Sequence, residues 1–166
     1  MISTKSEREL DLMREAGRIA FEAQEVVKEA IKPGVSTKHL DDLAHRYILS
    51  QGATPAFLGY NDFSGSICAS VNEVLVHGIP SSDEILKSGD IITIDVGAIY
   101  KGYYSDHAWT YPVGEISDEA KKLLEVSEES LFAGIEAAVA GNRVGDIGHA
   151  IMQVVLPHGY GLPVEY

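Results

Sequence analysis

The chain has 166 residues, of which 45% are hydrophobic and 23% are charged, which is ordinary for one globular domain with a sizeable core. Its 25 acidic and 13 basic residues give a net charge of −12, which argues against a broad nucleic-acid-binding surface because such a surface needs clustered Lys and Arg. The single cysteine, Cys68, excludes an internal disulfide and fits a reducing cytosol. No stretch approaches the ~18 apolar residues of a membrane helix, and the first residues lack the apolar core of a signal peptide, so we expect no membrane association and a cytoplasmic location.

The first third of the chain predicts two amphipathic helices. Ser6 opens a capping-box pattern, and apolar residues then recur at three- and four-residue steps until Pro33 stops the helix. These apolar residues are Leu10, Met13, Ala16, Ala20, Ala23, Val27 and Ile31. A second helix, capped by Ser36 or Thr37, is expected to end at Gly52.

The middle of the chain is rich in β-branched and aromatic residues, which favour strands. We expect short strands at residues 53–60, 67–71 and 74–77, and a β-hairpin formed by residues 91–100 and 103–111. Two more helices should cover residues 117–141 and about 144–155, and residues 160–166 look like the start of another strand. This order of elements predicts an α+β fold in which an antiparallel sheet is flanked by helices.

Two acidic residues of the expected hairpin are brought together by its register. If Lys101-Gly102 forms the turn, Asp106 lies opposite Gly97 and Asp95 lies opposite Ala108, all on one face of the sheet. The two carboxylates are then diagonal neighbours, roughly 7–8 Å apart at the backbone. Two buried carboxylates repel each other, and a divalent cation would relieve that repulsion. The register alone favours a solvent-exposed face that carries two Asp residues; the surrounding motifs favour a metal site.

Three ordered motifs surround this pair, and their sequences are VNEVLVHGIP (71–80), LKSGDIITIDVG (86–97) and GYYSD (102–106). With MREAGR (13–18), KPGVST (32–37) and GEIS (114–117) they closely resemble type I methionine aminopeptidase, which has the pita-bread metallopeptidase fold. The resemblance covers nearly the whole chain. It implies a metalloaminopeptidase, a hydrolase that uses two divalent ions (Co, Mn, Fe, Zn or Ni) to remove the N-terminal methionine from nascent proteins and peptides. It further implies a protein that is usually monomeric and that has the ribosome as an additional partner.

The resemblance also implies roles for single residues. Asp95 matches a bidentate ligand of one metal, and Asp106 matches the carboxylate that bridges both metals. His77 matches the histidine that contacts the substrate beside the scissile peptide and stabilises charge in the transition state; taken by itself, it is more typical of a structural histidine. The pocket for the methionine side chain would be lined by Tyr60, Phe63 and Cys68, which without the resemblance would be interpreted as core residues.

Some positions differ from the family pattern, and part of the pattern is not present. Val76, Phe63 and Gly97 stand where various relatives have Cys, Tyr and Thr. The family's site needs three further ligands, a His in a Gly-His-Gly motif and two later Glu, and neither segment occurs in the chain. The segment His158-Gly159-Tyr160-Gly161 resembles the first motif, but it precedes the expected position. The other histidines, expected to be surface or packing residues, are His39, His45, His107 and His149.

From this we expect residues 1–166 to be a single, C-terminally truncated catalytic domain. Alone it should bind metal weakly and be inactive, because a catalytic zinc usually has at least three protein ligands. Two alternatives stay open. One is a proline-directed aminopeptidase or creatine-type hydrolase with the same fold. The other is a non-catalytic module that binds peptides or a ribosomal partner, which the Asp95–Asp106 pair argues against because a scaffold gains nothing from it.

Overall fold

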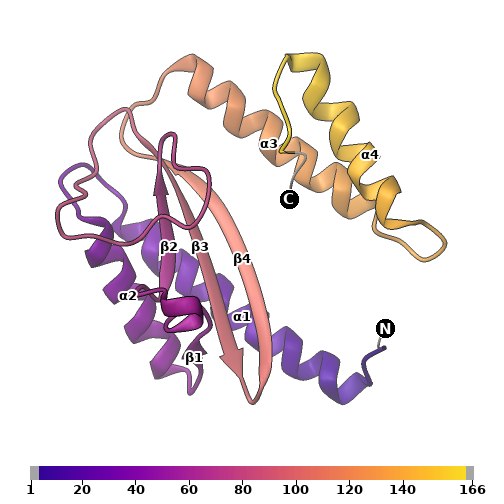
Figure 1. Cartoon of the computed structure of the whole chain (residues 1–166), viewed down its shortest axis with the longest axis horizontal. Coiled ribbons are helices and arrows are strands. Elements are labelled where there is room, and N and C mark those ends of the chain that lie inside the picture. Colours follow the sequence, from indigo (N-terminus) through magenta and orange to yellow (C-terminus); the bar gives the residue numbers. More distant parts are fainter. Residues whose placement is uncertain (1–3, 164–166) are drawn as a thin grey trace. The chain divides into compact units, whose positions relative to one another are not determined.

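A computed structural model describes residues 4–163 of the chain. Its elements are α1 (Glu7–Ala30), α2 (Thr37–Ser50), β1 (Thr54–Pro55), the 3-10 helix η1 (Tyr60–Asp62), β2 (Ile67–Val71), β3 (Ile91–Tyr100), β4 (Tyr103–Pro112), α3 (Asp118–Ala137), α4 (Val144–Val155) and the 3-10 helix η2 (Leu156–His158) (Figure 1). The helices and the antiparallel sheet confirm the α+β prediction. The chain forms two compact units, Met1–Ile116 and Ser117–Tyr166, and the prediction of one incomplete catalytic domain stays a prediction.

The first unit is organised around the central strand β3. Strands β1 and β2 both pair with one side of β3 along its length, and β4 pairs with the other side, always antiparallel. The β3–β4 register is the predicted one, with Tyr100 opposite Tyr103. Lys101 and Gly102 have φ values of 49° and 86°, which is the backbone that a two-residue hairpin turn requires. The hairpin register therefore fixes which residues share each face of the sheet.

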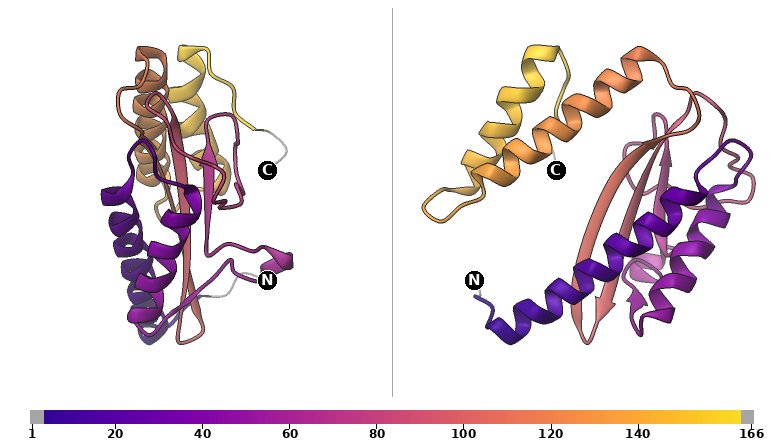
Figure 2. Two further views of the ribbon diagram at one scale, coloured as in Figure 1. Left: turned by 90° about the vertical axis from the view of Figure 1, so that its left-hand side faces the viewer. Right: turned by 180° about the vertical axis from the view of Figure 1, so that it is seen from behind.

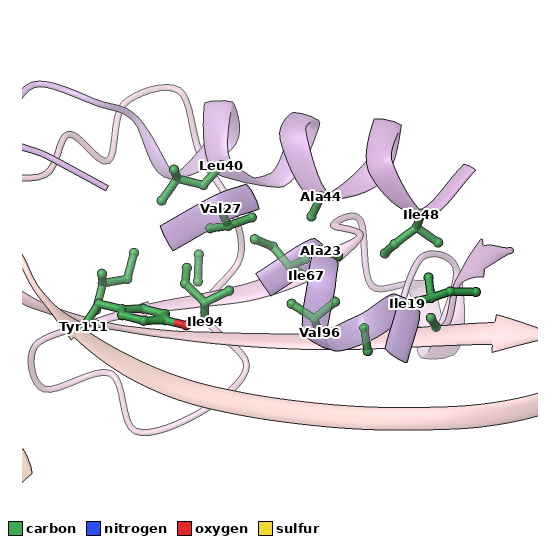
Figure 3. Close-up of a cluster of buried hydrophobic side chains, with 14 of the residues drawn as sticks. Ile19, Ala23, Val27, Leu40, Ala44, Ile48, Ile67, Ile94, Val96 and Tyr111 are labelled. Atoms are coloured by element: carbon green, nitrogen blue, oxygen red, sulfur yellow. The ribbon is translucent and has the colours of Figure 1, made fainter. Parts of the chain in front are cut away.

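Helices α1 and α2 cover one face of this sheet (Figures 1 and 2). The buried residues of α1 recur at helical spacing and are Ala16, Ile19, Ala20, Ala23, Gln24 and Val27. The predicted stripe missed Ile19 and Gln24, and one of its members, Met13, is exposed. Of the buried α1 residues, Ile19, Ala20, Ala23 and Val27 join side chains from α2, β2, β3 and β4 in one hydrophobic core (Figure 3). Each fully buried Ile or Leu contributes roughly 1.5–3 kcal/mol.

A buried carboxylate connects α2 to the start of β2. Asp41, which is 4% exposed, accepts hydrogen bonds from the backbone N–H groups of Ser66 at 2.6 Å and of Ile67 at 3.1 Å. Lys38 Nζ lies 3.2 Å from the same carboxylate, so the negative charge is both hydrogen-bonded and paired. This contact fixes the position of β2, one strand of the candidate site.

Three strand predictions differ from the structure. Within residues 53–60 only Thr54–Pro55 is a strand, and Tyr60 begins η1 instead. Residues 74–77 are not a strand, because the chain turns back after β2: Val74 N–H donates to Val71 O at 3.1 Å. Residues 160–163 have no regular structure, and the remainder of that predicted strand, 164–166, lies outside the described residues.

The second unit contains the helices α3 and α4. Ser117 caps α3 by accepting from Ala120 N–H at 3.1 Å, as predicted. The helices pack closely at Gly134, where a Cβ atom would lie 3.0 Å from Ile151. Helix α3 ends at Ala137, four residues before the predicted stop at Gly141. Among the residues described here, no helix of the chain is both long and apolar enough to cross a membrane.

Candidate active site

Asp95 and Asp106 lie on the same face of the β3–β4 hairpin. Asp95 is opposite Ala108 and Asp106 is opposite Gly97, so the two carboxylates are diagonal neighbours on adjacent strands. Both line one cavity of about 370 Å³. On the other side of β3, Cys68 of β2 is opposite Asp95. Three adjacent strands therefore contribute side chains to one cavity.

The electrostatics of this pair are unfavourable without a cation. Burial, the charge of Asp106 and a hydrogen bond with Asp106 together raise the pKa of Asp95 to about 7. Asp95 Oδ1 is a buried oxygen that has no hydrogen-bond partner among the described residues, which is rare in folded proteins. A carboxylate oxygen that is buried, unpartnered and beside a second carboxylate has the properties of a ligand for a divalent cation.

His77 lies on the irregular segment between β2 and β3, at the rim of the same cavity. Its φ of 59° is in the left-handed region, which non-glycine residues adopt infrequently. The preceding residues Val74, Leu75 and Val76 are all exposed. The imidazole of His77 and the carboxylates of Asp95 and Asp106 therefore face one cavity although they are separated in sequence.

Aromatic rings and one thiol line most of the rest of the cavity. Tyr60, Phe63 and Cys68, the three residues expected to bind a side chain, all line it. Cys68 is 4% exposed, and its burial together with the charges of Asp95 and Asp106 raises the pKa of the thiol to about 12. A protonated, buried thiol is a weak nucleophile, so Cys68 serves here as an apolar surface.

Two further residues, which were not predicted from sequence, line the cavity: Phe57 and Asn61. Phe57 is placed by Gly97: a Cβ atom at position 97 would lie 2.6 Å from the Phe57 ring and 2.8 Å from Ala56 Cβ. The absence of a side chain at Gly97 thus gives the ring its place beside the hairpin. The available signal was Gly97 itself, a glycine in the middle of an otherwise β-branched strand.

The other histidines of the first unit do not face the cavity, as predicted. His107 follows Asp106 but points to the helix side, where its Nδ1 donates to Gln24 Oε1 at 3.1 Å. His45 Nδ1 lies 2.8 Å from Ser66 Oγ, and His39 follows the cap of α2 and is exposed. In the second unit His149 is exposed, and His158 belongs to η2.

The carboxylates of Asp95 and Asp106 fit a divalent cation, and they offer it two side chains as ligands. Across residues 4–163 there is no cluster of three or more His, Cys, Asp or Glu side chains arranged to hold a metal ion. Catalytic zinc, by comparison, has three protein ligands. Further ligands for a catalytic centre would therefore have to come from outside the described residues.

A carboxylate pair beside an imidazole and an apolar pocket is a set of groups that suits metal-assisted chemistry on a bound ligand. Residues 11–165 match the model of metallopeptidase family M24. The chain belongs to this family.

Several relatives carry a more specific name. Methionine aminopeptidase 1 of Bacillus subtilis is 57% identical over the whole chain, which covers 66% of that relative. The solved structure of methionine aminopeptidase from Rickettsia prowazekii has a TM-score of 0.97 and 40% identity, with 100% of this chain and 66% of that one covered. Xaa-Pro dipeptidase from Bacillus anthracis has a TM-score of 0.83 and 30% identity, with 95% and 42% covered. The chain thus spans slightly less than two thirds of the length of its methionine aminopeptidase relatives.

Proposed function

We propose that this chain is the part of a methionine aminopeptidase that binds the N-terminal methionine of a nascent protein or peptide and holds the catalytic metals through Asp95 and Asp106. The observation that carries the proposal is the unpartnered, buried Asp95 Oδ1 beside Asp106, in a cavity that is also lined by three aromatic rings and a thiol. The 57% identity to the Bacillus subtilis relative supports this substrate over others in the family.

Asp95 and Asp106 would hold the metal. When bound, two divalent ions supply a water of lowered pKa and polarise the scissile carbonyl. The two carboxylates are diagonal neighbours on hydrogen-bonded strands and line the same cavity, so we expect little of their geometry to change on binding. The remaining ligands that the family resemblance implies, a His and two Glu, belong to other segments.

His77 and the pocket walls act on the peptide. The His77 imidazole lies at the rim of the cavity and would donate a hydrogen bond to the carbonyl oxygen as negative charge develops on it. The rings of Phe57 and Phe63 and the thiol of Cys68 would surround the methionine side chain and exclude water. A thioether has little capacity for hydrogen bonds, so an apolar pocket of fitting shape is what selects it.

Finer properties of the complete enzyme follow from the same resemblance. The cofactors would be two divalent ions drawn from Co, Mn, Fe, Zn and Ni, and carboxylate oxygens favour the harder ions of that group. The enzyme would act in the cytoplasm, as a monomer, on polypeptides that emerge from the ribosome. The 166-residue chain by itself, with two metal-binding carboxylates, should bind metal weakly and release no methionine.

The alternative supported by a specific observation is a proline-directed peptidase of the same family. The similarity to the Bacillus anthracis Xaa-Pro dipeptidase extends over 95% of the chain. Its identity is 30%, against 57% for the methionine aminopeptidase of Bacillus subtilis, which favours the methionine-directed interpretation. A non-catalytic peptide-binding module would keep the pocket but would not need both carboxylates.

A complementation assay tests the proposal. The chain is mixed with the remaining third of the Bacillus subtilis relative, and release of methionine from a Met-Ala peptide is measured with Mn²⁺ or Co²⁺. We expect release in the mixture only, and loss of release when the chain carries Asp106→Ala. An Xaa-Pro peptide in the same assay tests the proline-directed alternative.

The control variant is Asp83→Asn, which removes an exposed carboxylate outside the cavity and should leave release unchanged. Full activity of the Asp106→Ala mixture would refute the metal site. Cleavage of the Xaa-Pro peptide in preference to Met-Ala would refute the proposed substrate. Binding of a Met peptide with no release in any mixture would favour the non-catalytic module.

A further inference from the structure

The segment that carries His77 is held against β2 by contacts at two consecutive residues. Gly78 O accepts a hydrogen bond from Ala69 N–H at 2.9 Å, and Gly78 N–H donates to Ser70 Oγ at 3.0 Å. Two consecutive residues of β2 thus bind Gly78, Ala69 through its main chain and Ser70 through its side chain.

The backbone of Gly78 lies closer to β2 than a residue with a side chain could. A Cβ atom at Gly78 would lie 2.2 Å from Ala69 O and 2.8 Å from Ser70 Cα. His77 has a φ of 59°, a conformation that a non-glycine residue keeps only when its surroundings impose it. The direction in which the His77 imidazole points is therefore set by these contacts and not by regular secondary structure.

Ser70 provides the side-chain contact to this segment. Its hydroxyl oxygen is a good acceptor for the Gly78 N–H. Ser70 is 3% exposed, so water cannot readily replace its hydrogen bond to Gly78. Ser70 and Cys68 are two residues apart on β2 and share the face of the sheet that carries Asp95, but Ser70 does not line the cavity.

We propose that Ser70 is a positioning residue for His77. Its hydroxyl fixes the backbone of Gly78, and through it holds the left-handed turn at His77 that directs the imidazole into the cavity with Asp95 and Asp106. The proposal rests on the proposed function, in which His77 contacts the scissile carbonyl. It predicts that the position of His77 depends on the hydroxyl of residue 70 and not on the volume of its side chain.

Ser70→Ala removes the hydroxyl and Ser70→Thr keeps it. The first readout is amide hydrogen exchange at Gly78 in the metal-free protein, which needs no activity: we expect exchange about tenfold or more faster in Ser70→Ala and close to the original rate in Ser70→Thr. The second readout is methionine release by the active complex. Because small misplacements of a catalytic group cost one to two orders of magnitude, kcat should fall about tenfold or more in Ser70→Ala, with KM changed less than about twofold, and Ser70→Thr should restore most of it.

Ser66→Ala is the matched control. Ser66 is also buried, at 2% exposure, and its hydroxyl lies 2.8 Å from His45 Nδ1 instead of contacting the His77 segment. We expect Ser66→Ala to lower the melting temperature without changing exchange at Gly78 or kcat.

The proposal is overturned if Ser70→Ala keeps slow exchange at Gly78 and full kcat, if Ser66→Ala lowers kcat as much, or if Ser70→Thr restores neither readout. Should the unaltered complex release no methionine at all, the proposed function fails, while the exchange measurement still decides whether Ser70 fixes the backbone at His77.

Discussion

At the scale of single residues, Asp95 carries the strongest functional signal in the chain. Its Oδ1 is buried without a partner in the described structure, and its pKa is raised to about 7, first by burial and then by the charge of Asp106. An ionised carboxylate in such a place lowers the stability of the metal-free protein. A site that is unfavourable when empty and favourable when a cation binds is typical of function and not of packing.

Asp95→Asn should separate the destabilisation by the buried charge from the stabilisation by a bound cation. In EDTA at pH 8 the neutral amide removes the buried negative charge, so the melting temperature should rise by about 2–4 °C. The same variant should lose the increase in melting temperature that Mn²⁺ gives the original chain, because an amide is a poor substitute for a carboxylate ligand. Differential scanning calorimetry measures both. A melting temperature that falls in EDTA would mean that the charge is stabilised by groups other than a metal.

At the scale of elements, the first turn of α1 is tied to the hairpin through Glu9. The carboxylate of Glu9 accepts from Ser6 N–H at 2.8 Å, from Ser6 Oγ at 2.7 Å and from Tyr103 O–H at 3.0 Å. These hydrogen bonds, the one from the Ser6 backbone first, lower the pKa of Glu9 from 4.5 to about 2. The Ser6–Glu9 capping box, which the sequence predicts as a local feature of α1, therefore also joins α1 to β4.

The stability that Glu9 contributes should depend on pH. Because the pKa of Glu9 is lower in the folded state, the contribution is complete above about pH 4.5 and is lost as pH falls towards about 2. Glu9→Gln should therefore lower the melting temperature at pH 6, and the difference from the original chain should shrink through this window. Tyr103→Phe, which removes one of the three hydrogen bonds to Glu9, should lower the melting temperature at pH 6 by a smaller amount. A difference that is the same at pH 6 and at pH 2.5 would contradict this account.

At the scale of the whole molecule, the core and the candidate site belong to the same unit. The buried cluster draws its members from Ile19 to Val113, and the cavity is lined by residues 57 to 106, all within Met1–Ile116. The second unit buries few side chains, among them Val126, Ser130 and Val155. The first unit therefore contains what is needed to fold and to present the carboxylate pair.

A fragment of residues 1–116 should fold independently. We expect a cooperative thermal transition by circular dichroism, and Mn²⁺ binding by calorimetry that matches the 166-residue chain and is lost with Asp106→Ala. A fragment of residues 117–166 should show no cooperative transition, because a helical hairpin with so small a core cannot offset its conformational entropy. A 1–116 fragment that is unfolded would show that the core depends on contacts beyond it.

The helices and the β3–β4 hairpin could be predicted from sequence because periodicity and turn chemistry are local, whereas the short strands expected at residues 74–77 and 160–163 were wrong. The hairpin register followed from the turn at Lys101-Gly102, and strand alternation in that register put Asp95 and Asp106 on one face of the sheet. What could not be predicted was irregular: the turn that carries His77, and the place of Phe57 over Gly97. Both depend on a close contact of a glycine with residues elsewhere in the sequence: Gly78 with the backbone of Ala69, and Gly97 with the Phe57 ring. The pattern of apolar residues does not predict such contacts.

The most direct test of the account is the anomalous scattering of manganese in crystals of the chain grown with Mn²⁺. We predict a peak at roughly 2.0–2.6 Å from carboxylate oxygens of both Asp95 and Asp106, and no peak there in crystals of Asp106→Ala. Crystals of the original chain that hold Mn²⁺ elsewhere, with the two carboxylates directed to opposite sides of the sheet, would contradict the assignment of this chain as the metal-binding part of an aminopeptidase.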